Sequence, residues 1–429
     1  MSESIGSQAG LHGGRFIGWR MVGVGFLSNF LASGVTLATF GNFVDPVSES
    51  FGVTRSTTSQ GMAIVFVVTG LMGPLAGALL DRGWARPMMA TGSLLAGVGL
   101  ILLSRATELW QAAVLFCGVV GLGASLFGFL PAMALVSHWF VRQRGLAIGI
   151  SAAGLTIAAG LAPAGAEFLI GQYGWRSAMM ALGVFTLLIG FPTFAGFVVG
   201  RPERVGQWPD GDSAPVDEVA EGTQSADSEA QTRVLETREL VADRRLWLLS
   251  LGFGLILASP LVLTPIVVPY GTDLGLSELQ ASAFFLAMMP FSLLGKVVLG
   301  KWADMAPIKP AMAVVVLGNA VVWLILTIDP GYTLFLLTGA IYGLGIGGVA
   351  PLQGVTIGRC FGRENFGRAA GLGGLLSIVI IASAMVAFQT LYASTGSYQL
   401  GFLVQTALIF IGGALIFVVK IPKPIGDTA

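Results

Sequence analysis

Long apolar runs separated by short polar turns extend along the chain from residue 17 to residue 420. Each run has close to twenty residues, which is the length an α-helix needs to cross the hydrocarbon core of a bilayer. The runs are continuous and do not alternate, so they indicate helices and not barrel strands. The pattern predicts twelve membrane spans, at 17–42, 57–80, 87–104, 110–136, 145–170, 177–200, 246–270, 279–302, 310–328, 333–357, 368–392 and 399–420.

The composition supports an all-α integral membrane protein with twelve transmembrane helices. Of the 429 residues, 54% are hydrophobic and only 11% are charged, whereas soluble domains carry about a quarter charged residues. The formal net charge is zero, so the charge balance does not indicate a nucleic-acid partner. Cys117 and Cys360 fall in a predicted span and a predicted cytoplasmic loop, and we expect no disulfide between them.

Lysine and arginine residues are concentrated in the turns on one side of the predicted spans. Of the 23 basic residues, only Arg55, Arg105 and Arg176 fall on the opposite side, and Lys296 is set apart in the interior of a span, away from the basic residues at the span ends. An excess of positive charge marks the cytoplasmic side of membrane proteins. We therefore predict a multi-pass protein of the plasma (inner) membrane with both termini in the cytoplasm.

The two halves of the chain are repeats of one design. Gly77, Asp81 and Arg86 recur, at the same spacing, as Gly300, Asp304 and Lys309. Two six-span halves with matching turns predict two bundles related by a pseudo-two-fold axis along the membrane normal, with a central cavity between them. The predicted organisation is a cytoplasmic tail at 1–16, bundles at 17–200 and 246–420, a cytoplasmic linker at 201–245 and a second tail at 421–429.

The linker between the bundles is rich in glycine, proline, serine and acidic residues. A segment of this composition buries too little apolar surface to offset the entropy of ordering, so we expect most of it to be disordered. A short amphipathic piece near 231–245 is a candidate to lie along the inner membrane surface. The simpler interpretation of the whole linker is a plain tether between the bundles.

Residues 77–86, GALLDRGWAR, resemble the signature loop between the second and third spans of the major facilitator superfamily, with Ala85 in place of the usual glycine. In that family the loop acts in conformational change, and Asp81 is suited to accept hydrogen bonds from loop arginines and to face a helix end. The resemblance implies that clusters around Asp81/Arg86 and Asp304/Lys309 alternate as cytoplasmic latches. The residues assigned to this role are Gly77, Asp81, Arg82, Arg86, Arg142, Arg144, Gly300, Asp304 and Lys309.

A narrower resemblance comes from residues 138–154, HWFVRQRGLAIGISAAG, which are similar to the stretch entering the fifth span of monocarboxylate transporters and their bacterial oxalate/formate-antiporter-like relatives. Gly18-Trp19, Tyr173-Gly174-Trp175-Arg176 and Pro307-Ile308-Lys309-Pro310 agree with the same group. The resemblance implies a gradient-driven transporter of small organic anions that acts as a monomer.

Lys296 is the candidate substrate-binding cation. The first half has Gly73 at this position, and the resemblance aligns Lys296 with an eighth-span arginine that pairs with the substrate carboxylate. A cation within the membrane is costly and tends to persist where it has an anionic partner or a wet cavity. The alternative is a lysine that snorkels toward the surface near Lys301.

The surroundings of Lys296 favour a substrate with one negative charge. Ser292 stands where the family carries a carboxylate implicated in proton coupling, and the eleventh span has no internal cation, where oxalate-type relatives carry one. Glu167 is the acid that falls clearly within a span. We consider it and Lys296 as proton carriers, while the alternative for Glu167 is contact with interfacial water or with Arg176.

Further polar residues in the spans are candidates to line the cavity, although interhelical hydrogen bonds explain them equally well. These residues are Tyr342, Asn29, Ser33, Thr36, Tyr270 and Gln353.

The chain shows no nucleotide-binding loop, no histidines at metal-ligand spacing and no nucleophile elbow. We therefore expect no enzyme activity, no cofactor and no metal. The predicted function is secondary transport of small monocarboxylates of the lactate and pyruvate type, coupled to protons. The alternatives are an exporter of hydrophobic drugs or other organic anions, an organic-anion exchanger, and a sensor that binds a substrate without moving it.

Overall fold

A computed structural model describes residues 16–212 and 233–422, and every regular element in these two ranges is helical. The first half contains α1 (Gly18–Ser33), η1 (Gly34–Ala38), α2 (Phe40–Phe51), α3 (Arg55–Asp81), α4 (Ala85–Leu103), α5 (Leu109–Ala113), η2 (Val114–Val120), α6 (Gly121–Phe127), α7 (Phe129–Trp139), α8 (Arg144–Phe185), η3 (Thr186–Gly190) and α9 (Phe191–Phe197). The second half contains α12 (Thr237–Ala242), α13 (Arg244–Asp273), α14 (Glu278–Met305), α15 (Ile308–Leu326), α16 (Tyr332–Phe361), α17 (Phe366–Thr395) and α18 (Gln399–Val418). Two short 3₁₀ turns, η4 (Pro202–Val205) and η5 (Pro209–Gly211), follow α9.

Eleven helical stretches in the described ranges are long and apolar enough to cross a membrane. One of them runs from Arg144 to Phe197 over 54 residues, or about 80 Å at 1.5 Å per residue, which far exceeds a hydrocarbon core of about 30 Å. Gly174, at φ 77°, interrupts its helical backbone. This stretch therefore makes two crossings, and the predicted twelve spans of an all-α, multi-pass membrane protein are confirmed.

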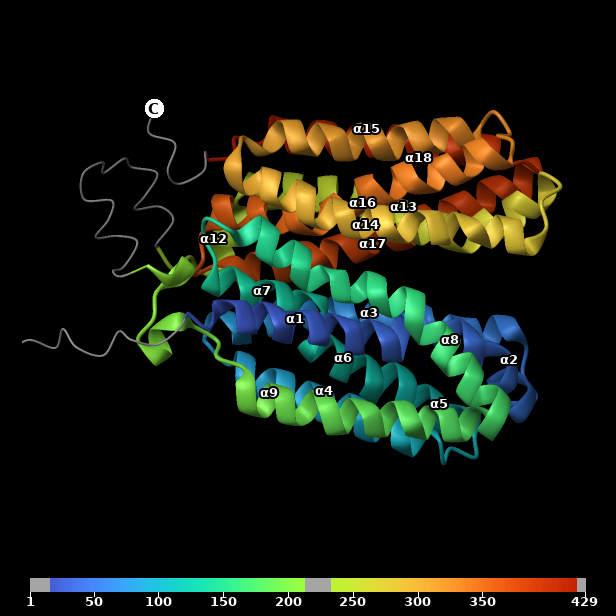
Figure 1. The fold of residues 1–429 in the computed structure, drawn as a ribbon, viewed down its shortest axis with the longest axis horizontal. Helices are drawn as coiled ribbons and strands as arrows, with labels where there is room; N and C mark the ends of the chain where they lie inside the picture. Colours follow the sequence, from blue (N-terminus) through green and yellow to red (C-terminus); the bar gives the residue numbers. More distant parts are fainter. Residues whose placement is uncertain (1–15, 213–232, 423–429) are drawn as a thin grey trace, which may run out of the picture.

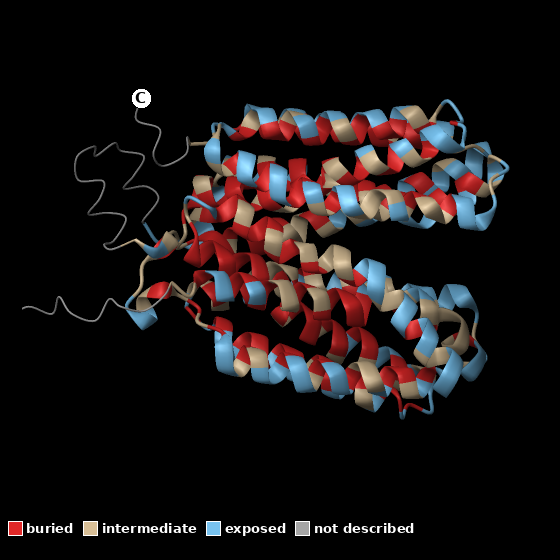
Figure 2. Cartoon of the chain, viewed as in Figure 1, coloured by how far each residue is buried: buried red, intermediate tan, exposed pale blue. Residues whose placement is uncertain are grey.

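The helices form two bundles, one from residues 16–200 and one from residues 244–422 (Figure 1). Helices α3 and α8 of the first bundle pack against α17 and α14 of the second. Large apolar side chains such as Phe168, Leu286 and Val418 are exposed, as is usual for helices that contact lipid. Buried residues gather inside each bundle and where the bundles meet (Figure 2).

The two ends of the bundles differ. Residues 201–212 and α12 lie at one end, which we call the linker end, and α2 lies at the opposite, far end (Figure 1). Near the linker end the bundles approach through glycine pairs. A methyl group at Gly77 would overlap the backbone of Gly367, and one at Gly145 would overlap the backbone of Gly300. The ribbons of the two bundles diverge from this contact toward the far end (Figure 1).

The linker is partly built into the fold. Residues 201–212 and 233–243 have defined positions, whereas 213–232 and the tails at 1–15 and 423–429 lie outside the described residues. Predictions about the acidic stretch and the tails therefore refer to residues on which the structure gives no information. In the amphipathic piece near 231–245, α12 buries Leu240 completely within the main hydrophobic core, so this helix packs against the protein.

Candidate functional site

The position of Lys296 follows from the close approach of α14 to α8. A methyl group at Gly149 of α8 would overlap the backbone carbonyl of Lys296, so only glycine allows the two helices to touch here. On its other side Lys296 adjoins Gly347 of α16, whose missing side chain leaves room for the α14 backbone. The side chain of Lys296 is buried as a result, with 7% of its surface exposed.

The Lys296 ammonium is held by two hydroxyl groups. Nζ donates to Oγ1 of Thr156 at 2.7 Å and to Oγ of Ser292 at 3.0 Å. Thr156 lies on α8 of the other bundle, and Ser292 lies one turn earlier on α14, toward the far end. The ammonium is thus directed away from Lys301, which does not fit a lysine that snorkels toward the linker end.

No carboxylate within the described ranges lies in ion-pair distance of Lys296. An ammonium group has three N–H donors, and the two hydroxyls use two of them. The Lys296 ammonium is therefore a buried positive charge that donates to two neutral hydroxyls, and its third N–H group has no acceptor among the hydrogen bonds of the described ranges. Chemically, it is suited to receive an anion.

The candidates in the first span bond within their own bundle. Asn29 donates from Nδ2 to the carbonyl of Ser151 at 3.0 Å and to its hydroxyl at 3.3 Å. Its Oδ1 is buried and has no hydrogen-bond partner in the part of the chain that the structure describes. Thr36 donates to the carbonyl of Ala32 in the preceding turn, and Ser33 is buried.

The candidate tyrosines belong to the core of the second bundle. The hydroxyl of Tyr342 shares a 2.9 Å hydrogen bond with Ser259, which also accepts from Trp323 Nε1 at 2.8 Å. Tyr270 donates to the carbonyl of Leu326 at 2.6 Å and lies 3.2 Å from a carboxylate oxygen of Asp329.

Gln353 of α16 is half-buried, and its Oε1 has no partner among residues 16–212 and 233–422. None of these candidates is hydrogen-bonded to Lys296.

Glu167 lies apart from Lys296. It accepts a 2.9 Å hydrogen bond from Asn42 Nδ2 in an exposed position at the far end. Arg176 does not pair with it, because this arginine donates to the carbonyl of Ala106 and lies over the ring of Trp175. Glu167 is therefore exposed and bonded to Asn42, and its role as a proton carrier or as an interfacial residue stays a prediction.

Two aspartates at the linker end bind helix N-termini of the opposite bundle, and we call these contacts latches. Asp81, at the end of α3, accepts from the backbone N–H groups of Gly367 and Arg368 at 2.7 and 2.9 Å and from Arg368 Nε at 3.0 Å. Asp304, at the end of α14, accepts from the N–H groups of Gly145 and Leu146 at 2.6 and 2.9 Å. Each carboxylate thus faces the positive end of a helix dipole, as expected for Asp81.

The basic residues predicted to join the latches bond elsewhere. Arg86 donates to the carbonyl of Ala195, and Lys309 donates to the carbonyl of Phe417, each within its own bundle. In the structure Arg86 therefore ties the start of α4 to α9, and Lys309 ties the start of α15 to α18. The pairing of Arg86 with Asp81 and of Lys309 with Asp304 is not present.

The remaining conformational candidates differ in their surroundings. Arg82 is exposed, and Arg142 binds residues of the linker, Asp210 and Asp212. Arg144 is buried, donates to the carbonyls of Phe140 and Ser137, and fits against Gly358 of the other bundle, where a methyl group would overlap its guanidinium.

Thr156 is the site residue that sequence reasoning missed. A signal for it exists in the spacing of the fifth span. Gly145 and Gly149 mark the face of α8 that touches α14, and residue 156 is seven positions further, two turns along the same face. A hydroxyl on a face that otherwise carries small residues is a candidate to meet the lysine of the neighbouring helix.

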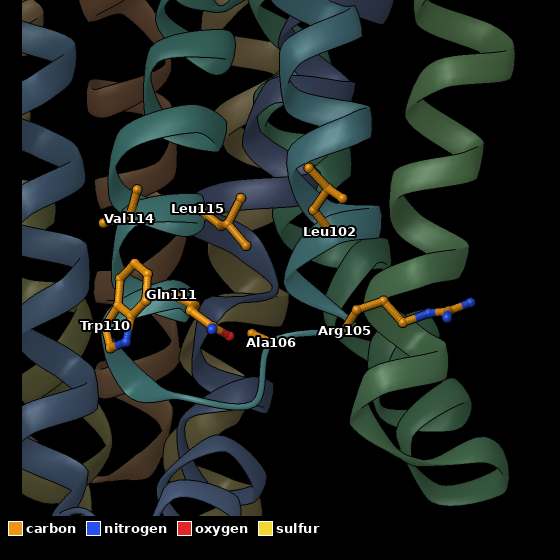
Figure 3. Close-up of a pocket in the computed structure, with 7 residues that line it drawn as sticks. All are labelled: Leu102, Arg105, Ala106, Trp110, Gln111, Val114 and Leu115. Carbon is orange, nitrogen blue, oxygen red and sulfur yellow. The ribbon is translucent and has the colours of Figure 1, made fainter.

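Two pockets lie on the first bundle near the far end. One, of about 310 Å³, is lined by Leu102, Arg105, Ala106, Trp110, Gln111, Val114 and Leu115 (Figure 3). Arg105 points away from Trp110 and Gln111 in this pocket (Figure 3). The other, of about 470 Å³, is lined by Asp45, Ser48, Glu49, Gly52, Val53 and Arg55. Neither pocket contains a predicted substrate residue, and the central cavity between the bundles stays a prediction.

Comparison with known proteins gives a consistent result. The family model described as Major Facilitator Superfamily matches residues 24–328 and 262–428. Monocarboxylate transporter 2 of Homo sapiens is 25% identical over 374 residues, covering 83% of this chain and 75% of that protein. Monocarboxylate transporter 12 of Rattus norvegicus is 25% identical over 425 residues, covering 95% of this chain and 86% of that protein.

Solved structures share the fold. The proton:xylose symporter XylE bound to 6-bromo-6-deoxy-D-glucose superposes with a TM-score of 0.74 at 14% identity, covering 95% of this chain and 96% of that one. The human organic anion transporter MFSD10 (TETRAN) superposes with a TM-score of 0.63 at 18% identity, covering 93% and 98%. At these identities the likeness concerns the arrangement of the helices.

Proposed function

The chain belongs to the major facilitator superfamily of membrane transporters, and from this premise we propose that it carries small monocarboxylates of the lactate and pyruvate type by alternating access. Relatives named monocarboxylate transporters support the substrate class. The observation that carries the proposal is the buried Lys296 ammonium between the two bundles, held by neutral hydroxyls and without a carboxylate partner in the described ranges.

A monocarboxylate complements this site in charge and in hydrogen bonding. Its carboxylate accepts from the ammonium, and the hydroxyls of Ser292 and Thr156 each have a proton to donate to it. One positive charge balances one negative charge, whereas a dicarboxylate would bring a second charge without a partner. Because Ser292 and Thr156 lie on different bundles, the substrate contacts both halves of the transporter.

We assign proton coupling to Lys296. Ser292 replaces the acid of the related carriers, and Glu167 is bonded to Asn42 in an exposed position at the far end. Lys296 is thus the titratable group that the site itself contains. A neutral amine has no charge with which to hold an anion, so the proton and the monocarboxylate bind together and leave together.

The orientation is part of the proposal. The positive-inside rule places the linker end in the cytoplasm of a plasma (inner) membrane protein. The latches of Asp81 and Asp304 then close the cytoplasmic side, and the site opens outward. We further propose that the carrier acts as a monomer.

After Lys296, Asn29 is the next candidate for substrate binding, because its Oδ1 is buried and has no hydrogen-bond partner within the described ranges.

Uptake into proteoliposomes tests the function. Labelled lactate and pyruvate are supplied with and without an inward proton gradient, to the wild type and to Lys296→Ala and Lys301→Ala. Lys301 is the matched control because it lies on the same helix and is exposed.

We expect gradient-driven uptake that other monocarboxylates inhibit, lost in Lys296→Ala and kept in Lys301→Ala. Unchanged affinity and rate in Lys296→Ala would show that the assigned site is wrong. No flux of any acid by the wild type would favour the exporter of hydrophobic compounds.

A further inference from the structure

Four arginines surround the end of α9 at the linker end, where α9 ends and α1 and α4 begin (Figure 1). The guanidinium of Arg20, in the first turn of α1, lies over the ring of Phe197 at 5.4 Å from its centroid. Arg86, in the first turn of α4, donates from Nε to the carbonyl of Ala195 at 2.5 Å. The last turn of α9 thus contacts an arginine of α1 and an arginine of α4. We call the four residues the arginine patch; they are Arg20, Arg82, Arg86 and Arg204.

The other two arginines meet at the turn between α3 and α4. Arg82 lies in this turn, and Arg204 comes from η4, which follows α9. A methyl group at Gly83 would overlap Nη2 of Arg204, so this guanidinium rests on the backbone of the turn next to Arg82. Gly83 has a φ of 79°, a conformation that favours glycine. The absence of a side chain at Gly83 therefore allows the turn to form and leaves room for Arg204.

The positive charge of the patch has no acidic counterpart in the described ranges. All four arginines are exposed, and none of them belongs to an ion pair there. The acids beside Arg82 and Arg204 in the sequence have other partners, since Asp81 binds the N-terminus of α17 and Glu203 pairs with Arg363. Four like charges gathered in one place attract an anion from the surroundings.

Aromatic side chains place the patch at the surface of the bilayer. Trp84 and Phe197 are 58% and 51% exposed, and Trp19, next to Arg20, is 43% exposed. All three lie at the ends of candidate membrane spans or in the turn between two of them. Exposed tryptophan is typical of the membrane–water interface, where its ring lies at the level of the headgroups. The guanidinium groups of the patch are therefore at the depth of the lipid phosphates.

The repeat of this turn in the second bundle carries less charge. Lys309 takes the place of Arg86 and donates to the carbonyl of Phe417, whereas the uncharged Met305 takes the place of Arg82. The general excess of positive charge on one side of a membrane protein acts on both bundles alike. It does not explain why the arginines gather on the first bundle, which indicates a local ligand.

We propose that the arginine patch binds the headgroup of an anionic phospholipid in the leaflet at the linker end. Basic pockets between membrane helices bind such headgroups, and guanidinium groups match the oxygens of a phosphate with paired hydrogen bonds. Leu188 and Phe191, exposed in the stretch that leads to Phe197, are available to the acyl chains. The inference needs only that the linker end meets a bilayer surface, and it does not depend on which compound is carried.

Native mass spectrometry of the purified transporter measures the affinity for the first bound lipid. Phosphatidylglycerol is compared with phosphatidylcholine, which has a phosphate but no net charge, and with inorganic phosphate. One double variant, Arg20→Gln with Arg204→Gln, removes two charges of the patch, and a second, Arg20→Lys with Arg204→Lys, keeps them. The control is Lys301→Gln with Lys420→Gln, which removes two exposed charges from the linker end of the second bundle.

We expect the glutamine variant of the patch to bind phosphatidylglycerol about 25-fold more weakly than the wild type, or about fivefold for each arginine lost near an anionic lipid. The lysine variant should keep most of the affinity, because the charge is kept while the paired hydrogen bonds are lost. The second-bundle control should bind the first lipid as tightly as the wild type.

Equal losses in the glutamine variant of the patch and in the second-bundle control would overturn the proposal, because they would show a diffuse attraction without a site. Phosphatidylcholine that binds the wild type as tightly as phosphatidylglycerol would overturn it as well, and this comparison does not depend on the folding of any variant. Inorganic phosphate that binds with the affinity of phosphatidylglycerol would assign the patch to a soluble anion instead of a lipid.

Discussion

Lys296 of the second bundle donates a 2.7 Å hydrogen bond to Thr156 of the first. The other hydrogen bonds between helices of the two bundles in the described ranges lie at the linker end, around Asp81, Asp304 and Arg363. Lys296 is eight residues before Asp304 on α14, or about 12 Å along the helix. Among the hydrogen bonds between the bundles in the described ranges, that of the buried cation therefore lies furthest from the linker end.

Thr156→Val tests whether this hydroxyl contacts the substrate. Valine has the shape of threonine without the hydroxyl, so the packing of α8 is kept while one hydrogen bond to a charged group is lost. We expect the KM for monocarboxylate uptake to rise about tenfold, with the same amount of folded protein. Thr156→Ser keeps the hydroxyl and should return KM to near the wild-type value. Equal KM values for wild type and valine variant would remove Thr156 from the site.

Ser292→Asp tests the relation between anion and proton. The aspartate would lie one turn before Lys296, where the serine hydroxyl is now 3.0 Å from Nζ, and it would pair with the ammonium. We expect weaker binding of monocarboxylates at neutral pH and recovery as the pH falls, because a protonated aspartic acid releases the ammonium. The loss of affinity on raising the pH should thus begin at a lower pH than in the wild type.

The control for this variant is Ser292→Asn, which is similar in size and carries no charge. Its pH profile of uptake should follow that of the wild type. If the aspartate and asparagine variants share one profile, Lys296 is not the charge that holds the anion.

The sequence predicts those parts of the fold that local patterns determine. Twelve apolar runs predict twelve spans, because the length of each run is set by the thickness of the bilayer. The place of Asp81 opposite a helix end could also be predicted, since a carboxylate at the end of one helix is stabilised by the N-terminus of another. Lys296 stands out because a cation within a span needs a physical reason.

Contacts between distant residues could not be predicted in the same way. Thr156 and Lys296 are 140 positions apart, and whether they meet depends on the rotation of two helices about their axes. The same holds for Tyr342, whose hydroxyl reaches Ser259 inside its own bundle. In the linker, composition predicts disorder, yet Arg201 and Glu203 form ion pairs with Glu364 and Arg363, in a turn that is distant in sequence.

Removal of the latch charges should affect the two latches unequally. Asp81→Asn loses an interaction with the N-terminus of α17 and an ion pair with Arg368, whereas Asp304→Asn loses an interaction with the N-terminus of α8 and the more distant attraction of Arg144 and Arg359, with no ion pair within 4 Å in the described ranges. One charge at a helix N-terminus contributes about 1 kcal/mol.

We therefore expect both variants to open the linker end, and Asp81→Asn to open it further. The distance between spin labels that replace Trp84 and Met305, which are exposed at the linker end of different bundles, measures the opening. Asp45→Asn at the far end is the control. A larger effect of Asp304→Asn would contradict the unequal support of the two latches.

Gly149→Ala tests whether the close approach of α8 and α14 positions the lysine. The added methyl group would overlap the backbone carbonyl of Lys296, so the helices must separate, at a cost of about 1–3 kcal/mol for an overpacked contact. Gly165→Ala is the matched control, because it lies on the same helix and its methyl group would meet no atom within 4 Å. We expect a lower Tm and a higher KM in Gly149→Ala, and wild-type values in Gly165→Ala. Tm reports whether the contact stabilises the fold, and KM reports whether it positions the ammonium. A lower Tm with unchanged KM would mean that the contact only stabilises the fold, because Lys296 would still bind its anion after the helices had separated.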